Sequence, residues 1–309
     1  MLLNSKHVMD VASGKIFKNE ILISRLTAYY ELTKPGITFM VLASMLIGFI
    51  AGSEGLYNYF TMLHAVIGTF LIASGTAAHN QFIERNLDKL MNRTSSRPIP
   101  SERISSENAF IFSITLILAG LIYLLYMVNF TAGIISALTT LLYLGIYTPM
   151  KRRTFLNVIV GSIPGALPPV GGWAAATGSV TEPAVWLLFA IILLWQIPHV
   201  LAIAWVCNDD YTSAGFRMLP NNDASGLKTS TISLLSLIAL IPTIYLMFWI
   251  GMADLLFLAT GLLATLVYNF YGLQFLFSRE NKEAKKLMFA SFIYLPVLWI
   301  FLLADVLII

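Results

Sequence analysis

Between two hydrophobic runs the chain reads Asn80-Gln-Phe-Ile-Glu84-Arg85-Asn86-Leu-Asp88-Lys89-Leu-Met91-Asn-Arg93-Thr94-Ser-Ser-Arg97-Pro98. Asn80, Glu84 and Asp88 are four residues apart, so on a helix each lies only about 40° round from the one before. One helix face then carries an amide and two carboxylates. We expect the helix to continue through Arg93 and Arg97 and to end at Pro98. Such a stretch suits a metal ion that bridges to a phosphorylated ligand, but also a solvated helix end with ion pairs.

The composition places the chain in a membrane. Of its 309 residues 58% are hydrophobic and only 11% are charged, whereas a soluble domain is about half apolar and a quarter charged. The net charge of +3 does not indicate nucleic acid, because basic residues in a membrane protein report its orientation. The single cysteine, Cys207, excludes an internal disulfide and a multi-cysteine metal site. Residues 1–30 lack the apolar core of a signal peptide.

Apolar runs long enough to cross a bilayer predict an all-α, polytopic membrane protein with nine transmembrane helices. We expect one transmembrane domain over residues 1–309, with residues 1–33 as an amino-terminal arm. The predicted spans are 37–53, 60–82, 107–127, 131–148, 156–177, 183–206, 230–251, 254–277 and 287–307.

The basic residues predict the orientation of these spans. All 19 Lys and Arg residues fall in the arm or in the loops on one face of the predicted bundle. The positive-inside rule therefore places the amino terminus in the cytoplasm and the carboxyl terminus outside, in the cell (inner or plasma) membrane.

A second acidic pair, Asp209-Asp210, ends the sixth predicted span, as Glu84 and Asp88 end the second. Both pairs precede long loops, 83–106 and 207–229, on the basic face. The second and sixth spans are four apart, which suggests a tandem repeat of a four-helix unit. Hard carboxylate oxygens suit Mg²⁺, and we predict Glu84, Asp88, Asp209 and Asp210 as its ligands. We expect these helix ends to be wet, so that alanine substitutions there change catalysis and leave folding largely intact.

Two further elements admit two interpretations each. The bases Lys151-Arg152-Arg153 after Tyr147-Thr148-Pro149 could anchor the chain by the positive-inside rule, or hold a diphosphate group. The fifth span contains Pro164-Gly165 and Pro168-Pro169 among its glycines and prolines. Such a broken helix either lines a cavity or packs closely against its neighbours.

At this point the motifs resemble the UbiA superfamily of intramembrane prenyltransferases. The likeness extends from about Lys34-Pro35 to Pro220, and its Asn-xxx-acid motifs are common to the superfamily. The Lys151-Arg-Arg-Thr154 and Trp195-Gln-Ile-Pro-His199 blocks point to the haem branch, the haem O synthases. The chain departs from that pattern at Glu84 and Asn86, where the family usually has aspartate, and at Asp209, where relatives often differ.

The resemblance implies transfer of a farnesyl group from farnesyl diphosphate to a vinyl group of haem B, with addition of water, to give haem O for terminal oxidase assembly. It implies Mg²⁺ at Glu84, Asp88 and Asp210 with help from Asn80, and diphosphate binding by bases. The substrates and the lipid bilayer are the expected partners, with a downstream haem A synthase or oxidase assembly as a further one. The diphosphate-binding set comprises Arg93, Arg97, Lys151, Arg152 and Arg153.

Two other functions remain open at this stage. Prenylation of a quinone precursor or another aromatic acceptor needs the same acids, and only the haem-branch blocks argue against it. A transporter would carry its acids near the membrane midplane, not at helix ends.

His199 is predicted as an axial haem ligand, with His79 as the next candidate. His199 precedes Asp210 by about three helical turns, or roughly 16 Å, which is about the width of a porphyrin. A histidine within a helix is more often a hydrogen-bonded polar residue of the core.

Overall fold

A computed structural model describes residues 23–308, and every regular element in this part of the chain is helical. Residues 23–32 form a helix that precedes the first span. The elements that follow are α2 (Pro35–Gly52), α3 (Tyr59–Asp88), α4 (Ser106–Met127), α5 (Phe130–Leu141), the π-helix η1 (Leu142–Tyr147), α6 (Thr148–Met150), α7 (Asn157–Ala166), α8 (Pro168–Thr177), α9 (Pro183–Val206), α10 (Asn208–Ser213), the 3-10 helix η2 (Leu219–Asn222), α11 (Leu227–Trp249), α12 (Leu255–Ser278) and α13 (Asn281–Ile308).

Within residues 23–308, nine helical segments are long and apolar enough to cross a membrane, and they confirm the nine predicted spans. Two of these segments combine consecutive elements: Phe130–Met150 joins α5, η1 and α6, and Asn157–Thr177 joins α7 and α8. The chain is therefore an integral membrane protein of the all-α class. The largest departures are six residues each: α3 continues past its expected end at 82 to Asp88, and α13 begins at Asn281 rather than at 287.

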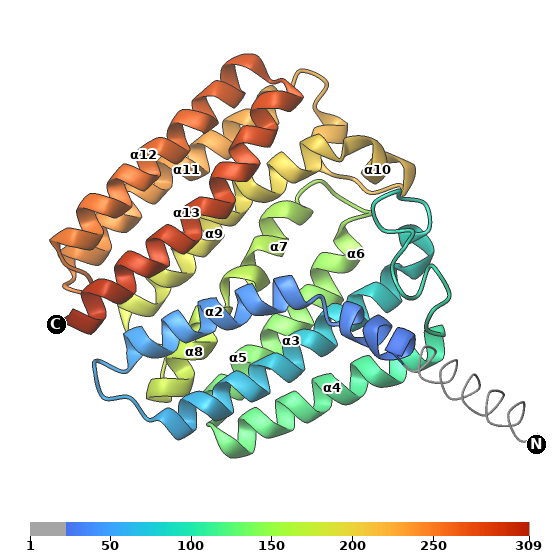
Figure 1. Cartoon of the computed structure of the whole chain (residues 1–309). Coiled ribbons are helices and arrows are strands. Elements are labelled where there is room, and N and C mark those ends of the chain that lie inside the picture. The colour runs from blue at the N-terminus through green and yellow to red at the C-terminus, as the bar shows by residue number, and fades with distance from the viewer. Residues whose placement is uncertain (1–22, 309) are drawn as a thin grey trace, which may run out of the picture.

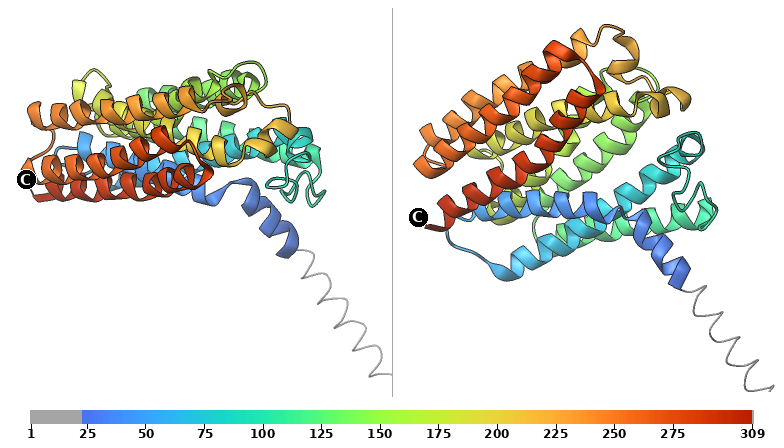
Figure 2. Two further views of the ribbon diagram at one scale, coloured as in Figure 1. Left: turned by 90° about the horizontal axis from the view of Figure 1, so that it is seen from above. Right: turned by 45° about the horizontal axis from the view of Figure 1, so that its top comes forward.

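The spans form a closed bundle (Figure 1). Each span contacts the next one along the chain, and the last, α13, contacts the first, α2. Two further views show the helices lying side by side, with the long loops gathered at one end (Figure 2). We call this the basic end of the bundle; it holds the loops that follow α3, α6, α9 and α12.

Proline and glycine break the fifth span, as its sequence predicts. Pro164 lies inside α7, and Pro168 begins α8. Close packing accounts for the α8 half: a Cβ atom on Gly172 would lie 1.8 Å from the carbonyl oxygen of Met45 in α2. A Cβ atom on Gly48 of α2 would likewise lie 1.9 Å from the carbonyl oxygen of Pro169. Only glycine permits this approach of α2 to α8.

Candidate functional site

The acidic face of α3 lies buried at the basic end of the bundle. Asn80, Glu84 and Asp88 are 1%, 5% and 0% exposed. Their spacing places all three on one face of a continuous helix, as predicted. The burial contradicts our expectation of wet helix ends, because a basic side chain from another segment bonds to each of the three. Substitution of Asp88 is therefore expected to lower stability as well as activity.

The helix ends earlier than the sequence spacing predicts. α3 stops at Asp88, and turns replace helix over residues 89–103, so Arg93 and Arg97 do not extend the acidic face. The buried Thr94 stabilises the turn by donating its hydroxyl to the carbonyl oxygen of Asp88, at 2.9 Å. The chain then returns Arg97 to the end of the helix, where Nη1 lies 2.8 Å from both carboxylate oxygens of Asp88.

Lys151 approaches Glu84 from the fourth span. Its Nζ donates to Oε1 of Glu84 at 2.8 Å and lies 4.8 Å from the ring centre of Tyr147. The π-helix η1 ends four residues before this lysine, with the short helix α6 between them. Turns of π-helix recur at functional sites. Arg152 and Arg153 are exposed, and neither side chain bonds to an acid among residues 23–308. The structure thus brings one base of the three to the acids.

Lys34 is a site residue that the sequence analysis did not select. Its Nζ donates to Oδ1 of Asn80 at 3.0 Å, and the Asn80 amide donates in turn to the Thr148 hydroxyl at 3.3 Å. Burial and the nearby positive charge of Arg97 lower the pKa of Lys34. The residue has φ 47° and ψ 63° directly before a proline, a position where non-glycine residues avoid the left-handed region. In the sequence, the position of Lys34 directly before Pro35, at the start of the first span, could have pointed to this residue.

Asp210 joins the two long loops. Its carboxylate accepts the backbone N–H groups of Asn92 at 3.2 Å and Arg93 at 3.4 Å. Arg93 also donates to the Tyr211 hydroxyl at 3.2 Å. Asp209 is exposed and has no side-chain hydrogen bond within the described chain. The two neighbouring aspartates are therefore not equivalent.

Aromatic rings form a wall beside the buried charges. The rings of Tyr143 and Tyr147 lie 5.3 Å apart, and Phe216 lies 5.8 Å from Nζ of Lys151. Gly161 of α7 makes room for the Tyr147 ring, since a Cβ atom there would lie 2.4 Å from two ring carbons. Electron-rich ring faces attract cations, so this wall suits a cationic intermediate.

His199 lies on α9 and faces α13. Its Nδ1 shares a hydrogen bond of 2.6 Å with the Ser291 hydroxyl, and its ring stacks on Trp195 with 5.0 Å between centres. Trp195 donates to the carbonyl oxygen of Ser291 at 2.9 Å. His79 shares a hydrogen bond of 2.9 Å with Ser113 of α4. These contacts hold helices together, and the axial-ligand role of either histidine stays a prediction.

The acids can hold Mg²⁺ only together with a ligand that supplies further oxygen atoms. Among residues 23–308 no three His, Cys, Asp or Glu side chains are close enough to hold an ion by themselves. Glu84 and Asp88 supply two carboxylates one helical turn apart, with the Asn80 amide one turn further. Because Mg²⁺ is usually held by one or two carboxylates plus substrate phosphates, this donor set fits an ion that binds with a diphosphate.

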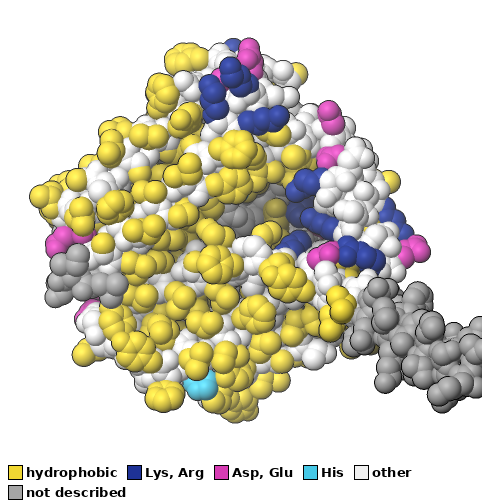
Figure 3. All heavy atoms as spheres, viewed as in Figure 1, with side chains coloured by type: hydrophobic (Ala, Val, Ile, Leu, Met, Phe, Trp, Pro, Cys, Tyr) yellow, Lys and Arg dark blue, Asp and Glu magenta, His cyan; other side chains and the backbone are white. Residues whose placement is uncertain are grey.

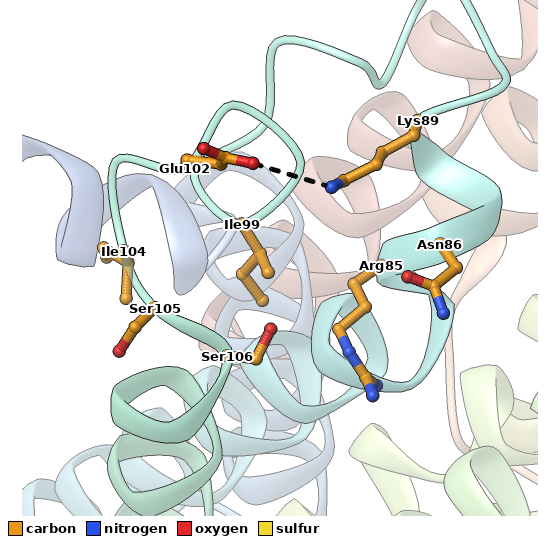
Figure 4. A pocket seen from close by; sticks show the side chains of 8 residues that line it. All are labelled: Arg85, Asn86, Lys89, Ile99, Glu102, Ile104, Ser105 and Ser106. Carbon is orange, nitrogen blue, oxygen red and sulfur yellow. Dashed lines mark ion pairs between the residues drawn. The ribbon is translucent and has the colours of Figure 1, made fainter.

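A hollow opens beside this site on the hydrophobic face in Figure 3, and Lys and Arg side chains border one side of it. A separate cavity of about 320 Å³ lies at the same end of the bundle, between α3 and the start of α4 (Figure 4). Its lining includes Arg85, Lys89 and Glu102, but none of the three acidic-face residues Asn80, Glu84 and Asp88. The acidic face therefore does not line this cavity.

Solved structures with the same fold define the class of this protein. A digeranylgeranylglyceryl phosphate synthase matches with a TM-score of 0.78 and 17% identity, over 92% of this chain and 99% of that one. A UbiA homolog from Aeropyrum pernix matches with a TM-score of 0.68 and 17% identity, over 87% and 97%. A UbiA homolog from Archaeoglobus fulgidus bound to GPP and Mg²⁺ matches with a TM-score of 0.58 and 16% identity, over 89% and 99%. The fold is that of helical intramembrane prenyltransferases.

The chain belongs to the UbiA prenyltransferase family, whose model matches residues 41–295. A protoheme IX farnesyltransferase from Solibacter usitatus is 42% identical, over 90% of this chain and 98% of that protein. A protoheme IX farnesyltransferase from Aquifex aeolicus is 37% identical, over 90% and 94%. These matches confirm the resemblance drawn from the motifs.

Proposed function

We propose that this prenyltransferase transfers a farnesyl group from farnesyl diphosphate to a vinyl carbon of haem B and adds water to give haem O. The observation that supports a prenyl transfer reaction is the set of ion pairs between acids and bases at the end of α3. There two buried carboxylates, Glu84 and Asp88, each meet a base from another segment. The haem acceptor follows from relatives with 33–42% identity that carry the name protoheme IX farnesyltransferase.

Mg²⁺ held by Glu84 and Asp88 together with the diphosphate would neutralise that group and ease cleavage of the allylic C–O bond. The Mg²⁺ and GPP bound to the Archaeoglobus homolog support this assignment. Asp210 belongs to no three-acid cluster among residues 23–308, so its role as a further ligand stays a prediction. Arg97 and Lys151, which bond to Asp88 and Glu84, would donate to the phosphate oxygens as negative charge develops there. Lys34 would orient the Asn80 amide.

The aromatic wall and the loops govern the carbon chemistry. Tyr143 and Tyr147 would face the farnesyl cation that forms when diphosphate leaves. The vinyl group attacks this cation, and the new cation on the haem side chain takes up water and loses a proton, which gives the hydroxyl group. The loops joined by Asp210 would exclude water until the first carbon bond has formed.

The decisive experiment incubates purified protein with haem B, farnesyl diphosphate and Mg²⁺ and determines the mass of the product. We expect haem O together with free diphosphate, and no product in EDTA. A parallel incubation replaces haem B by an aromatic acid of the quinone-precursor type. Prenylation of that acid with haem B untouched would refute the haem assignment, although the family assignment would stand.

The site also favours an enzyme over a transporter. The buried acids lie at one end of α3, not halfway along it. We propose that this end is cytoplasmic, because the bases are concentrated there. Reporter fusions in the 207–229 loop and after Asp305 should report opposite sides of the membrane, and the same side for both would refute the orientation.

A further inference from the structure

A groove of about 830 Å³ runs between α12 and α13, away from the acids. Its walls include Leu263, Phe270 and Ile293, which are exposed on the outside of the bundle. Between Thr260 and Gln274, both of which line it, the helix rises by about 21 Å. One bilayer leaflet with its headgroup region is about 20–22 Å thick. The groove thus has the length of one leaflet.

Polar atoms without partners lie along this otherwise apolar groove. The side-chain oxygen of Gln274 is buried and has no hydrogen-bond partner in the described chain. At the same end as Gln274, one carboxylate oxygen of Glu283 is also buried and unpaired among residues 23–308. A polar atom buried in hydrocarbon costs several kcal/mol unless it is satisfied. Gln274 and Glu283 present acceptor oxygens, so a ligand that satisfies them must carry a hydrogen-bond donor.

The same end of the groove is positively charged. Residues 279–286 contain four bases and two acids, an excess of two positive charges (Figure 3, top). Lys286 lines the groove and donates to Glu283 at 2.9 Å, which uses one of its three N–H groups. A ligand with an anionic group beside a hydrogen-bond donor would complement both Lys286 and Gln274.

We propose that this groove binds one glycerophospholipid molecule. Its acyl chain lies along α12 and α13, its phosphate meets Lys286, and its ammonium or hydroxyl headgroup donates to Gln274. A free phosphate or a fatty acid would satisfy only part of this arrangement, because each lacks either the chain or the donor.

The test measures lipid binding by native mass spectrometry of the full chain in a detergent that is not a phospholipid. Phosphatidylethanolamine and phosphatidylglycerol are added separately, to distinguish an ammonium donor from a hydroxyl donor. Ala264→Trp fills the middle of the groove, and the double variant Gln274→Leu/Lys286→Met removes its polar end. The matched controls are Leu118→Trp, on the exposed side of α4, and Lys282→Met, a neighbouring base that does not line the groove.

Wild type and both controls should bind one phospholipid per chain. Each groove variant should bind it at least about tenfold more weakly, a change of about 1.4 kcal/mol. The double variant adds no bulk, so it keeps the test valid if Ala264→Trp fails to fold. Equal affinity in all variants would overturn the proposal, as would a wild type that binds no lipid. A lipid-free dimer that Ala264→Trp dissociates would show instead that a second copy occupies the groove.

Discussion

Replacement of Lys151 by methionine tests the centre of the proposed mechanism. Lys151 and Glu84 are 13% and 6% exposed, and their 2.8 Å contact gives an attraction of about 6 kcal/mol at an effective dielectric of about 20. Most of that energy offsets the loss of hydration. Removal of Lys151 alone leaves a buried carboxylate unpaired, so unfolding should become easier by about 3–5 kcal/mol. Turnover should fall by about 10²–10³-fold, because one group that stabilises the departing diphosphate is lost.

The assay pairs turnover, read as haem O mass, with thermal unfolding in detergent. Arg152→Met is the matched control: it removes the adjacent base, which is exposed and bonded to no acid in the described chain, and should change both quantities little. The double variant Lys151→Met/Glu84→Gln removes both charges and should regain stability while staying inactive. Equal losses in Lys151→Met and Arg152→Met would refute the reasoning, since a general positive anchor predicts that result.

Three further predictions address other parts of the site. Asp210→Ala should abolish turnover and speed trypsin cleavage after Arg93, because the backbone there loses its bonds to Asp210, whereas Asp209→Ala should do neither. Equal effects of the two variants would contradict the distinction between these aspartates. Gly161→Ala should displace the Tyr147 ring, with a loss of about 1–3 kcal/mol in stability and of most activity. Gly171→Ala is its control, since an added Cβ meets nothing closer than 3.7 Å, and equal melting temperatures would contradict the argument. His199→Ala should shift the Soret band of haem-loaded protein; an unchanged band and affinity would refute axial ligation.

The sequence predicts the spans well because a bilayer imposes a simple requirement on length and polarity. All nine apolar runs correspond to spanning segments in the described chain. The acidic face of α3 could be predicted equally well, since helical periodicity alone places Glu84 one turn before Asp88 on the same face.

The contacts around the acids could not be predicted in the same way, because they join segments distant in sequence. Arg97 reaches Asp88 through a turn that Thr94 stabilises, where helical spacing predicts a straight continuation. Lys34 is 46 positions from Asn80, and Asp210 is 118 positions from Asn92. No local periodicity encodes such pairs, and the same turns that create them also bury the acids.

The contact of α13 with α2 closes the bundle without any covalent link, and this limits how the chain could be rearranged. Because residues 23–308 contain an odd number of spans, nine, the start of α2 and the end of α13 lie at opposite ends of the bundle (Figure 1). A circular permutant would need a linker that crosses the bilayer, in effect a tenth span. Only side-chain packing holds this junction, so the two spans can separate there without straining a loop. A cysteine pair engineered across α2 and α13 would supply the missing covalent closure.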